Sequence, residues 1–309
     1  MKTKKLLLIV MSLLMFAVVF STCYGAKKRV IGFSPTTLNN PFWHVIQVEV
    51  EKVIKAHGDS IVTTDPQNDQ SKQNDQIGDL VSQRVDALLI APCDSAGVKP
   101  ALLLCKEKNI PVINFDTPVK DTDLVSTIIA SDNYNAGVVV AKDMMARLKN
   151  GSKIAILHSP MGQACIDRVQ GFKDTIKDYF KVVSISDGKG DTGVSLPIAE
   201  DVLQSTPDLA AFFAVNDPSA FGCVQALAAH KLTGKVLVYG VDGNPQAKVD
   251  IANGTMAATG AQSPKTIGQK SIEAAYKLMN GQSVDPRIKI PTFLINKQNV
   301  KKYGTTSWQ

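Results

Sequence analysis

The chain has 309 residues, of which 44% are hydrophobic and 20% charged. This balance is typical of ordered globular proteins and excludes a disordered chain. The length exceeds what one ordinary hydrophobic core supports, so we expect two lobes. The formal net charge of +6 includes no block of like charge and no basic stripe interleaved with aromatic residues. Nucleic acid is therefore not an expected partner.

The N-terminal residues predict a signal peptide over 1–26. Lysines at the start precede an apolar run, 6–20, which is too short for a comfortable membrane span of about 20 residues. Small residues such as Gly25 and Ala26 then favour cleavage. We expect an exported, periplasmic protein; the alternatives are an uncleaved anchor and a lipoprotein attached through Cys23, whose preceding residues match a lipidation signal poorly.

Four cysteines follow the predicted cleavage site, and no two of them form a Cys-x-x-Cys motif. Export permits disulfides, although a chain of this size does not need them. We expect buried free thiols. The residues are Cys93, Cys105, Cys165 and Cys223.

The first half of the chain alternates short apolar strands with helical stripes. Such alternation predicts βαβ units and a parallel sheet covered on both faces. The predicted strands are Val30–Ser34, Ile61–Thr64, Ala87–Ile90, Val112–Phe115 and Ser126–Ala130, and the predicted helices are Phe42–His57, Ser71–Arg84 and Ser95–Lys108. Asp69 and the Asp94-Ser95 pair supply capping chemistry for two of these helices.

The second half repeats the pattern and predicts a second α/β lobe. Its predicted helices are Tyr134–Leu148, Ala164–Phe180, Ser195–Leu203, Ser219–His230 and Pro245–Asn253, and its predicted strands are Lys153–His158, Val182–Ser186, Ala210–Val215, Val236–Val241 and Met256–Ala261. The remaining helix Thr266–Met279 and the strand-like Ile288–Ile295 must dock on existing lobes. We expect a ligand in the crevice between the two lobes.

The polar loop before the first helix is the clearest candidate site. Asn39 or Asn40 can cap that helix, and Pro41 suits its first position. Two aromatic residues, Phe42 and Trp43, follow directly. Flat apolar faces beside carboxamides suit a sugar ring, whereas the alternative is a helix start whose aromatic side chains pack into the core.

Further polar side chains follow the predicted strands. Each can be interpreted singly as a helix cap, but their gathering at one sheet edge favours a ligand site. They are Asp116, Asn216, Asp242 and Gln262.

Catalytic and metal-binding motifs are not found. The histidines share no metal-ligand spacing, no Gly-x-Ser-x-Gly elbow occurs, and Asp187–Gly193 lacks the Gly-Lys-Ser/Thr order of a phosphate loop. We interpret 187–193 as a surface turn. We predict no catalytic residues, no metal and no cofactor; the enzyme alternative is an exported carbohydrate-active enzyme with Asp116 and Asp242 as paired carboxylates.

Several segments, in this order, carry a resemblance that covers nearly the whole chain after the signal peptide. They include Thr37–Phe42, Val85–Pro92, Ile110–Asp116, Ala130–Asn133 and Gly240–Gly243. In them the chain resembles the periplasmic sugar-binding proteins of the ribose/galactose type, which serve ABC importers.

The resemblance implies two Rossmann-like lobes with parallel sheets, joined by a three-strand hinge that crosses near Ser131, Gln262 and Lys289. Lobe one would comprise 27–131 and 263–289, and lobe two 132–262 and 290–309. It also implies a monosaccharide or polyol ligand, a membrane permease as partner, and a monomeric protein. A ligand-sensing role for a separate chemoreceptor or sensor kinase is the alternative.

The resemblance also assigns roles to single residues. It implies that Phe42 and Trp43 stack on the sugar ring. The residues that it implies hydrogen-bond to the sugar hydroxyls are Asn40, Asp116, Asn216, Asp242 and Gln262. Carboxylates accept strong bonds from hydroxyls, and carboxamides can both donate and accept.

Two ligand positions depart from the ribose-binding pattern, in which both carry arginine. Thr117 and Ile166 stand there in this chain, while Arg168 is kept. The loss of two guanidinium forks removes bidentate contacts. We therefore hypothesise that the ligand is another sugar, a polyol or a sugar-like signal rather than ribose.

Overall fold

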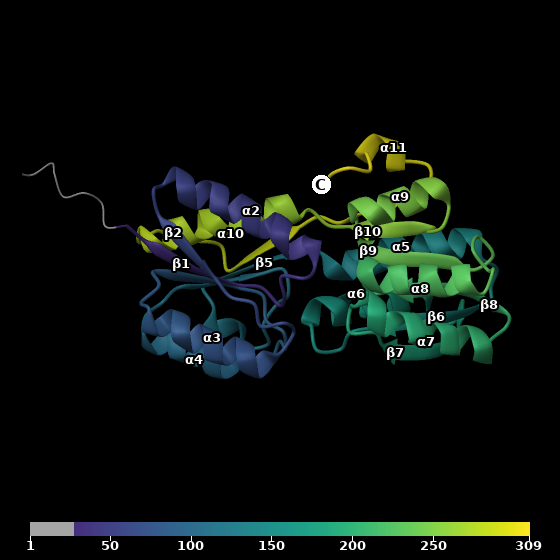
Figure 1. The fold of residues 1–309 in the computed structure, drawn as a ribbon, viewed down its shortest axis with the longest axis horizontal. Helices are drawn as coiled ribbons and strands as arrows, with labels where there is room; N and C mark the ends of the chain where they lie inside the picture. Colours follow the sequence, from purple (N-terminus) through teal and green to yellow (C-terminus); the bar gives the residue numbers. More distant parts are fainter. Residues whose placement is uncertain (1–27) are drawn as a thin grey trace, which may run out of the picture.

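The computed structural model describes residues 28–309, and they form two α/β lobes that lie side by side along the longest axis (Figure 1). The predicted signal peptide and Cys23 lie outside the described residues. Within residues 28–309, no helix combines the length and hydropathy that crossing a membrane requires. The two-lobed α/β architecture with parallel sheets is confirmed.

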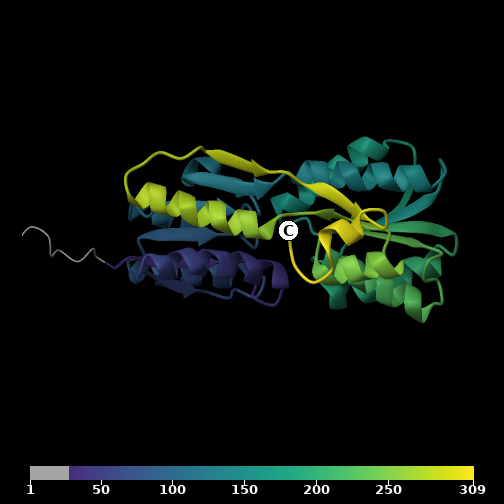
Figure 2. The ribbon, with the colours of Figure 1, turned by 90° about the horizontal axis from the view of Figure 1, so that it is seen from above.

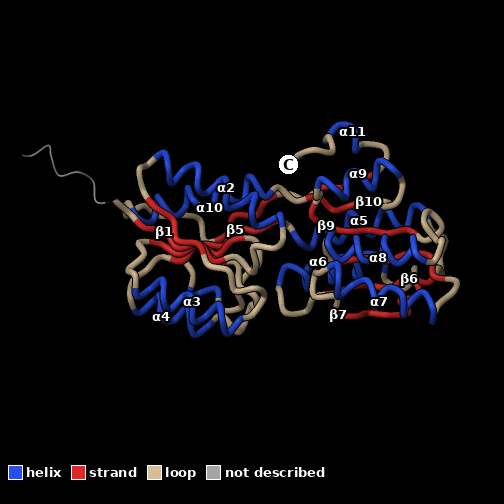
Figure 3. The backbone as a smooth tube through the Cα atoms, in the orientation of Figure 1, coloured by secondary structure: helices blue, strands red, loops and turns tan. Residues whose placement is uncertain are grey.

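The first lobe is built on a sheet of six parallel strands in the order β11-β5-β4-β3-β1-β2. The strands are β1 (Val30–Ser34), β2 (Ser60–Thr63), β3 (Ala87–Ile90), β4 (Val112–Phe115), β5 (Thr127–Ser131) and β11 (Arg287–Ile290). The helices are α2 (Pro41–Ala56), α3 (Gln70–Ser82), α4 (Lys99–Glu107), the short 3-10 helix η2 (Thr122–Leu124) and α10 (Pro264–Met279). Helices α2 and α10 cover one face and α3 and α4 the other (Figure 3).

The second lobe repeats this arrangement with the sheet order β12-β10-β9-β8-β6-β7, in which only β12 is antiparallel to its neighbour. The strands are β6 (Lys153–His158), β7 (Lys181–Asp187), β8 (Leu209–Ala214), β9 (Leu237–Asp242), β10 (Ala258–Ala261) and β12 (Phe293–Asn296). The helices are α5 (Asn133–Arg147), α6 (Gln163–Ile176), α7 (Thr192–Ser205), α8 (Asp217–Ala229), α9 (Pro245–Asn253) and α11 (Val300–Tyr303).

Alternate strand residues build a separate core on each face of both sheets. In β6, Ile154 and Ile156 pack with α5 and α6, whereas Ala155 and Leu157 pack with α7 and α8. This follows from the two-residue period of a strand, which sends neighbouring side chains to opposite faces. Both faces of a parallel sheet are therefore buried, as the continuous apolar strands predicted.

The chain passes between the lobes three times. The first crossing is at Asp132 between β5 and α5, and the second at 262–263 between β10 and α10. The third, predicted near Lys289, lies at Pro291 and Thr292. The predicted single strand Ile288–Ile295 is wrong at this point, because the chain leaves the first sheet after β11 and joins the second as β12.

These crossings place β11 and α10 in the first lobe and β12 in the second, as Figure 2 shows from above. The C-terminal tail then returns toward the first lobe, where Trp308 is buried in the cluster formed by α2 and α10. The buried Lys248 of α9 donates to the main chain of Ser307 and to the Gln309 amide. The residue boundaries proposed for the lobes stay a prediction.

Several helix boundaries also differ from the prediction, and two of them have a local explanation. Helix α4 begins at Lys99 rather than Ser95, because the Asp94 carboxylate accepts from the amides of Ala96 and Gly97 in a preceding turn. Helix α6 ends at Ile176, where Lys177 adopts a φ of 44°. Apolar periodicity alone does not register such local turns.

Glycines let α5 and α6 approach each other closely. A Cβ at Gly171 would lie 2.1 Å from the Tyr134 carbonyl oxygen, and one at Gly137 would lie 2.0 Å from the Arg168 carbonyl oxygen. Side chains larger than hydrogen at these positions would separate the helices. This contact sets how closely α6 lies against α5, and with it the position of Arg168.

We predict that Gly171→Ala lowers the free energy of unfolding by about 1–3 kcal/mol, because the added methyl forces α5 away from α6. Gly78→Ala is the matched control, since Gly78 lies in α3 with no atom near its Cβ position, and we expect it to stabilise by up to about 1 kcal/mol. Urea denaturation measures both. Equal effects of the two substitutions would contradict the close contact.

Candidate functional site

A cavity of about 450 Å³ lies between the lobes at the carboxyl ends of both sheets. This is where open α/β folds bind ligands, and the volume suits a small molecule. From the first lobe it is lined by Thr36, Thr37, Asn39, Asn40, Pro41, Trp43, Asn68, Pro92, Cys93 and Thr117. From the second lobe it is lined by Ser159, Gly162, Cys165, Lys189, Gly190, Asp191, Thr192, Asn216, Pro218, Phe221, Asn244 and Gln246.

The two asparagines predicted to bind ligand line this cavity and also cap helices. Asn40 Oδ1 accepts from the Phe42 amide at 3.0 Å, at the start of α2. Asn216 Oδ1 accepts from the Ser219 amide at 2.9 Å, and its Nδ2 donates to the Gly190 carbonyl at 2.9 Å. Each amide thus keeps part of its hydrogen-bonding capacity for a ligand while its orientation is fixed by a cap.

The aromatic pair divides between the cavity and the core. Trp43 lines the cavity, whereas Phe42 is absent from the lining and packs edge-on against Trp43 and Trp308, with ring centroids 5.2 and 5.7 Å away. Both Phe42 and Trp43 belong to the first-lobe core. The packing alternative therefore describes Phe42, and its stacking on a ligand stays a prediction.

The three other predicted polar residues are buried beside the cavity rather than on its lining. Asp116, Asp242 and Gln262 are only 4%, 4% and 1% exposed. Gln262 Nε2 donates to Asp242 Oδ1 at 2.7 Å, and Thr117 Oγ1 donates to Asp116 Oδ2 at 3.0 Å. Among the described residues, neither Asp116 Oδ1 nor Gln262 Oε1 has a partner.

Both aspartates occupy rare backbone conformations at the carboxyl end of a strand, Asp116 directly after β4 and Asp242 as the last residue of β9. The φ of Asp116 is 58° and that of Asp242 is 142°. Such strain costs about 1–3 kcal/mol per residue and is concentrated at ligand sites. The cavity-lining residues Asn68 and Lys189 share the feature, with φ of 61° and 53°. The cleft is therefore a place where backbone strain is maintained.

Arg168 of α6 connects the second-lobe acid to the hinge. Its Nε donates to Asn133 Oδ1 at 2.8 Å, its Nη1 donates to the Val215 carbonyl at 2.9 Å, and Nη1 lies 3.6 Å from Asp242 Oδ1. The guanidinium is 4% exposed. Sequence reasoning kept Arg168 but did not place it among the site residues.

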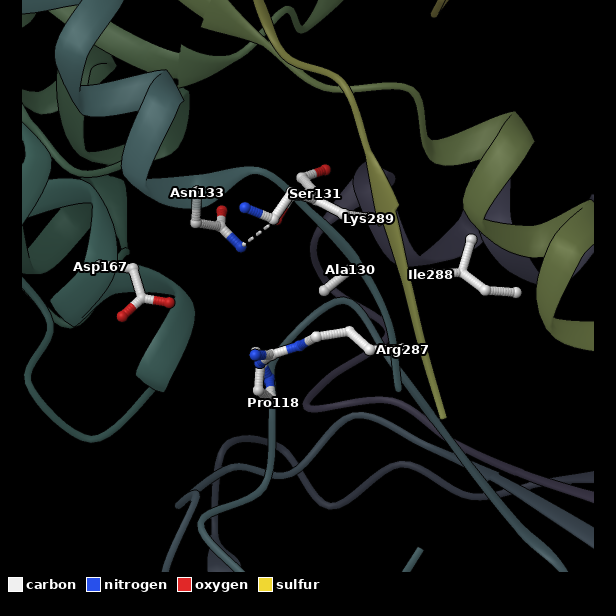
Figure 4. A pocket seen from close by; sticks show the side chains of 8 residues that line it. All are labelled: Pro118, Ala130, Ser131, Asn133, Asp167, Arg287, Ile288 and Lys289. Carbon is white, nitrogen blue, oxygen red and sulfur yellow. Dashed lines mark hydrogen bonds between the residues drawn. The ribbon is translucent and has the colours of Figure 1, made fainter. Parts of the chain in front are cut away.

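Asn133 belongs to the hinge itself. Its Nδ2 donates to the Ser131 carbonyl at 3.2 Å, the contact marked in Figure 4, so one amide joins the first crossing to Arg168. A cavity of about 90 Å³ lies here, lined by residues of both lobes. Beside it, Lys289 Nζ lies 3.3 Å from Asp132 Oδ2. Polar contacts thus connect the hinge to the site.

Burial controls the charge of these acids. It raises the pKa of Asp116, against the opposing effect of the Arg168 guanidinium. Burial also raises the pKa of Asp242, where Arg168 opposes the shift and the neighbouring Asp217 carboxylate adds to it. Asp217 is itself held by Thr259 Oγ1 at 2.7 Å and by the Asn244 amide at 2.8 Å. The Arg168 guanidinium thus opposes the rise in pKa of all three carboxyls.

Thr117 lines the cavity, but Ile166 does not and is 37% exposed; its neighbour Cys165 lines the cavity instead. The described cysteines are free as expected, yet Cys93 and Cys165 are only partly buried, unlike Cys105 and Cys223. Burial raises the pKa of the Cys93 thiol to about 12 and that of Cys165 to about 11. Both thiols therefore face the cavity uncharged.

Sequence reasoning also missed the turn after β7. The predicted surface turn is wrong in part, because Lys189, Gly190 and Asp191 line the cavity. Asn68, in the loop after β2, was missed as well. The available signal was that both loops follow carboxyl ends of predicted strands. Among residues 28–309, no group of three or more His, Cys, Asp or Glu side chains is arranged so that it could hold a metal ion.

Residues 31–283 match the family described as the periplasmic binding protein domain. This chain belongs to that family. Its members are binding proteins, in agreement with the prediction that the chain is not an enzyme. The ribose import binding protein of Bacillus subtilis is 36% identical over 270 residues, which cover 86% of this chain and 87% of the relative.

Two solved solute-binding proteins of ABC transporters share the fold of this periplasmic binding protein. The Agrobacterium vitis protein with bound D-fucose has a TM-score of 0.85 at 27% identity and covers 88% of this chain and 97% of its own. The Bacillus halodurans protein with bound myo-inositol has a TM-score of 0.84 at 27% identity and covers 90% and 98%.

We predict that the unliganded protein becomes less stable as pH rises from about 5 to 8. A carboxyl with a raised pKa keeps its proton in the folded state after the unfolded chain has lost it, so rising pH favours unfolding. Asp242→Asn should reduce this fall in stability with pH, whereas the control Asp201→Asn, at an exposed position, should leave the fall unchanged. Urea denaturation at several pH values measures the slope. Identical slopes in all three proteins would contradict the raised pKa of Asp242.

Proposed function

We propose that this chain is an exported, monomeric periplasmic binding protein that closes on a monosaccharide or polyol and delivers it to the membrane permease of an ABC importer. Two buried acceptors beside the cavity that lack a hydrogen-bond partner, Asp116 Oδ1 and Gln262 Oε1, carry the proposal. A buried acceptor without a partner costs about 1–3 kcal/mol. Ligand hydroxyls would supply the missing donors.

The distribution of acceptors over both lobes explains why binding would require closure. Asp116 follows β4 of the first lobe, whereas Asp242 ends β9 and Gln262 follows β10 of the second. A polyol that donates to both groups at once bridges the lobes and favours the closed form. Because one chain supplies both halves of the cleft, a monomer is sufficient.

The surroundings of the acids favour a neutral, hydroxyl-rich ligand. Arg168 is the basic residue in contact with Asp242 among the described residues, and Trp43 offers an apolar wall. An anionic ligand would meet three buried carboxyls, with the Arg168 guanidinium and the cavity-lining Lys189 to offset them. We further propose that Thr117, together with the exposed Ile166, makes the protein something other than a dedicated ribose receptor, although its relative in Bacillus subtilis is named for ribose import.

A thermal-shift titration of the exported protein tests this proposal. We expect one or more of D-ribose, D-fucose, D-allose, myo-inositol and related sugars to stabilise it by about 2.7 kcal/mol at a hundred times the dissociation constant. Asp116→Ala and Asp242→Ala should remove the shift, and Asp201→Ala should preserve it. No response to any sugar or polyol would contradict the function. Tight binding of ribose, well above all others, would contradict the ligand hypothesis.

A further inference from the structure

We infer that Ser95 is a closure latch, a residue that stabilises the closed form by capping a helix of the opposite lobe. Ser95 lies in the loop between β3 and α4 of the first lobe and is 6% exposed. Its Oγ accepts from the Gln163 amide at 2.9 Å, and its own amide donates to the Met161 carbonyl at 3.2 Å. Both partners belong to the second lobe. The inference rests on the closing motion of the proposed function.

The first turn of α6 provides the reason for this contact. Helix α6 begins at Gln163, and Gly162 at its N-cap position has no side chain to accept from the first amides. Serine is among the preferred residues at this position because its hydroxyl accepts such a bond. In this protein the hydroxyl comes from the other lobe. The cap of α6 is therefore completed only when the lobes meet.

The loop that carries Ser95 is held rigidly by its own lobe. The Ser95 carbonyl accepts from the Lys120 amide at 2.8 Å. The adjacent Asp94 amide donates to Gln70 Oε1 at 2.7 Å, and its carboxylate accepts from the two amides that follow Ser95, at 2.8 and 3.0 Å. The hydroxyl is thus preorganised before closure, so little ordering entropy opposes the contact.

The latch acts on the site through α6. That helix carries Cys165, which lines the cavity, and Arg168, which contacts Asp242. Ser95 itself is not among the cavity-lining residues. Its influence on affinity must therefore arise from the ratio of closed to open protein, which scales the apparent dissociation constant of any ligand that needs the closed form. Ser95 is a positioning residue rather than a ligand contact.

The test compares three variants of the exported protein. Ser95→Ala removes the hydroxyl, Ser95→Thr keeps it, and Ser82→Ala is the matched control. Ser82 lies in the same lobe and is exposed, and its hydroxyl bonds within α3 to the Gly78 carbonyl. Single-molecule energy transfer between dyes on α4 and α7 gives the closed-to-open ratio without ligand. Hydrogen exchange of the Gln163 amide reports the cap directly.

We expect Ser95→Ala to lower the closed-to-open ratio roughly twofold to thirtyfold, the range for loss of an N-cap, and to speed exchange at Gln163. The threonine variant and the Ser82 control should match the wild type. With D-fucose or myo-inositol as probe, the dissociation constant should rise in inverse proportion to the closed fraction.

An unchanged closed-to-open ratio and unchanged hydrogen exchange at Gln163 in Ser95→Ala would overturn the latch. So would a wild-type protein in which the dyes on α4 and α7 never come as close as the closed form requires. If no sugar binds, the proposed function fails, but the ligand-free ratio still decides the role of Ser95. If a sugar binds and the ratio is insensitive to Ser95, the latch fails and the function remains.

Discussion

The pairing of Arg168 with buried acids is the interaction on which the rest of the site depends. A buried ion costs several kcal/mol in lost hydration unless hydrogen bonds and opposite charge replace the water. The guanidinium meets this condition through an amide of the hinge, a carbonyl that follows β8 and the carboxyl at the end of β9. Removal of Arg168 would leave uncompensated carboxyls. Conversely, burial raises the pKa of both acids, and Arg168 opposes that rise.

The packing of α6 against α5 positions the Arg168 guanidinium beside these acids. Helix α6 can approach α5 because glycines lie at their contact, and the approach sets where Arg168 enters the cleft. Asn133 at the start of α5 then links Arg168 to the first crossing of the hinge. Asn133 and Arg168 thus form a short physical connection between the hinge and Asp242.

Much of the fold could be predicted from sequence because each sheet is buried on both faces. Strands such as 87–90 and 112–115 are short, mainly apolar runs, and the structure places them at the predicted bounds. Asp116, Asp242 and Gln262 were identified as site candidates because each follows a predicted strand, at the carboxyl edge of a sheet. Local chemistry was equally informative at Asn40, whose capping of α2 follows from its side chain and the proline after it.

The failures share a cause, which is dependence on partners remote in sequence. The Asp94-Ser95 pair carries capping chemistry, but no local pattern reveals that Ser95 caps α6 in the other lobe. The segment 288–295 has strand composition throughout, yet its halves join different sheets. Asn68 and the turn after β7 are polar loops whose position against the cavity depends on how two lobes meet. Hydrophobic periodicity predicts an element and its buried face, but it does not predict which residues of the other lobe lie opposite that element.

The dissociation constant of Arg168 variants tests the central claim most directly. With the sugar that stabilises the wild type, Arg168→Met and Arg168→Lys should both weaken binding roughly tenfold to a hundredfold, since a charged, forked hydrogen bond is lost. The control Arg147→Met removes a second-lobe guanidinium that pairs with Asp143 instead, and it should bind as the wild type does. Circular dichroism checks that all three variants are folded. If folded Arg168 variants bind with wild-type affinity, the site does not depend on this cation and the account is wrong.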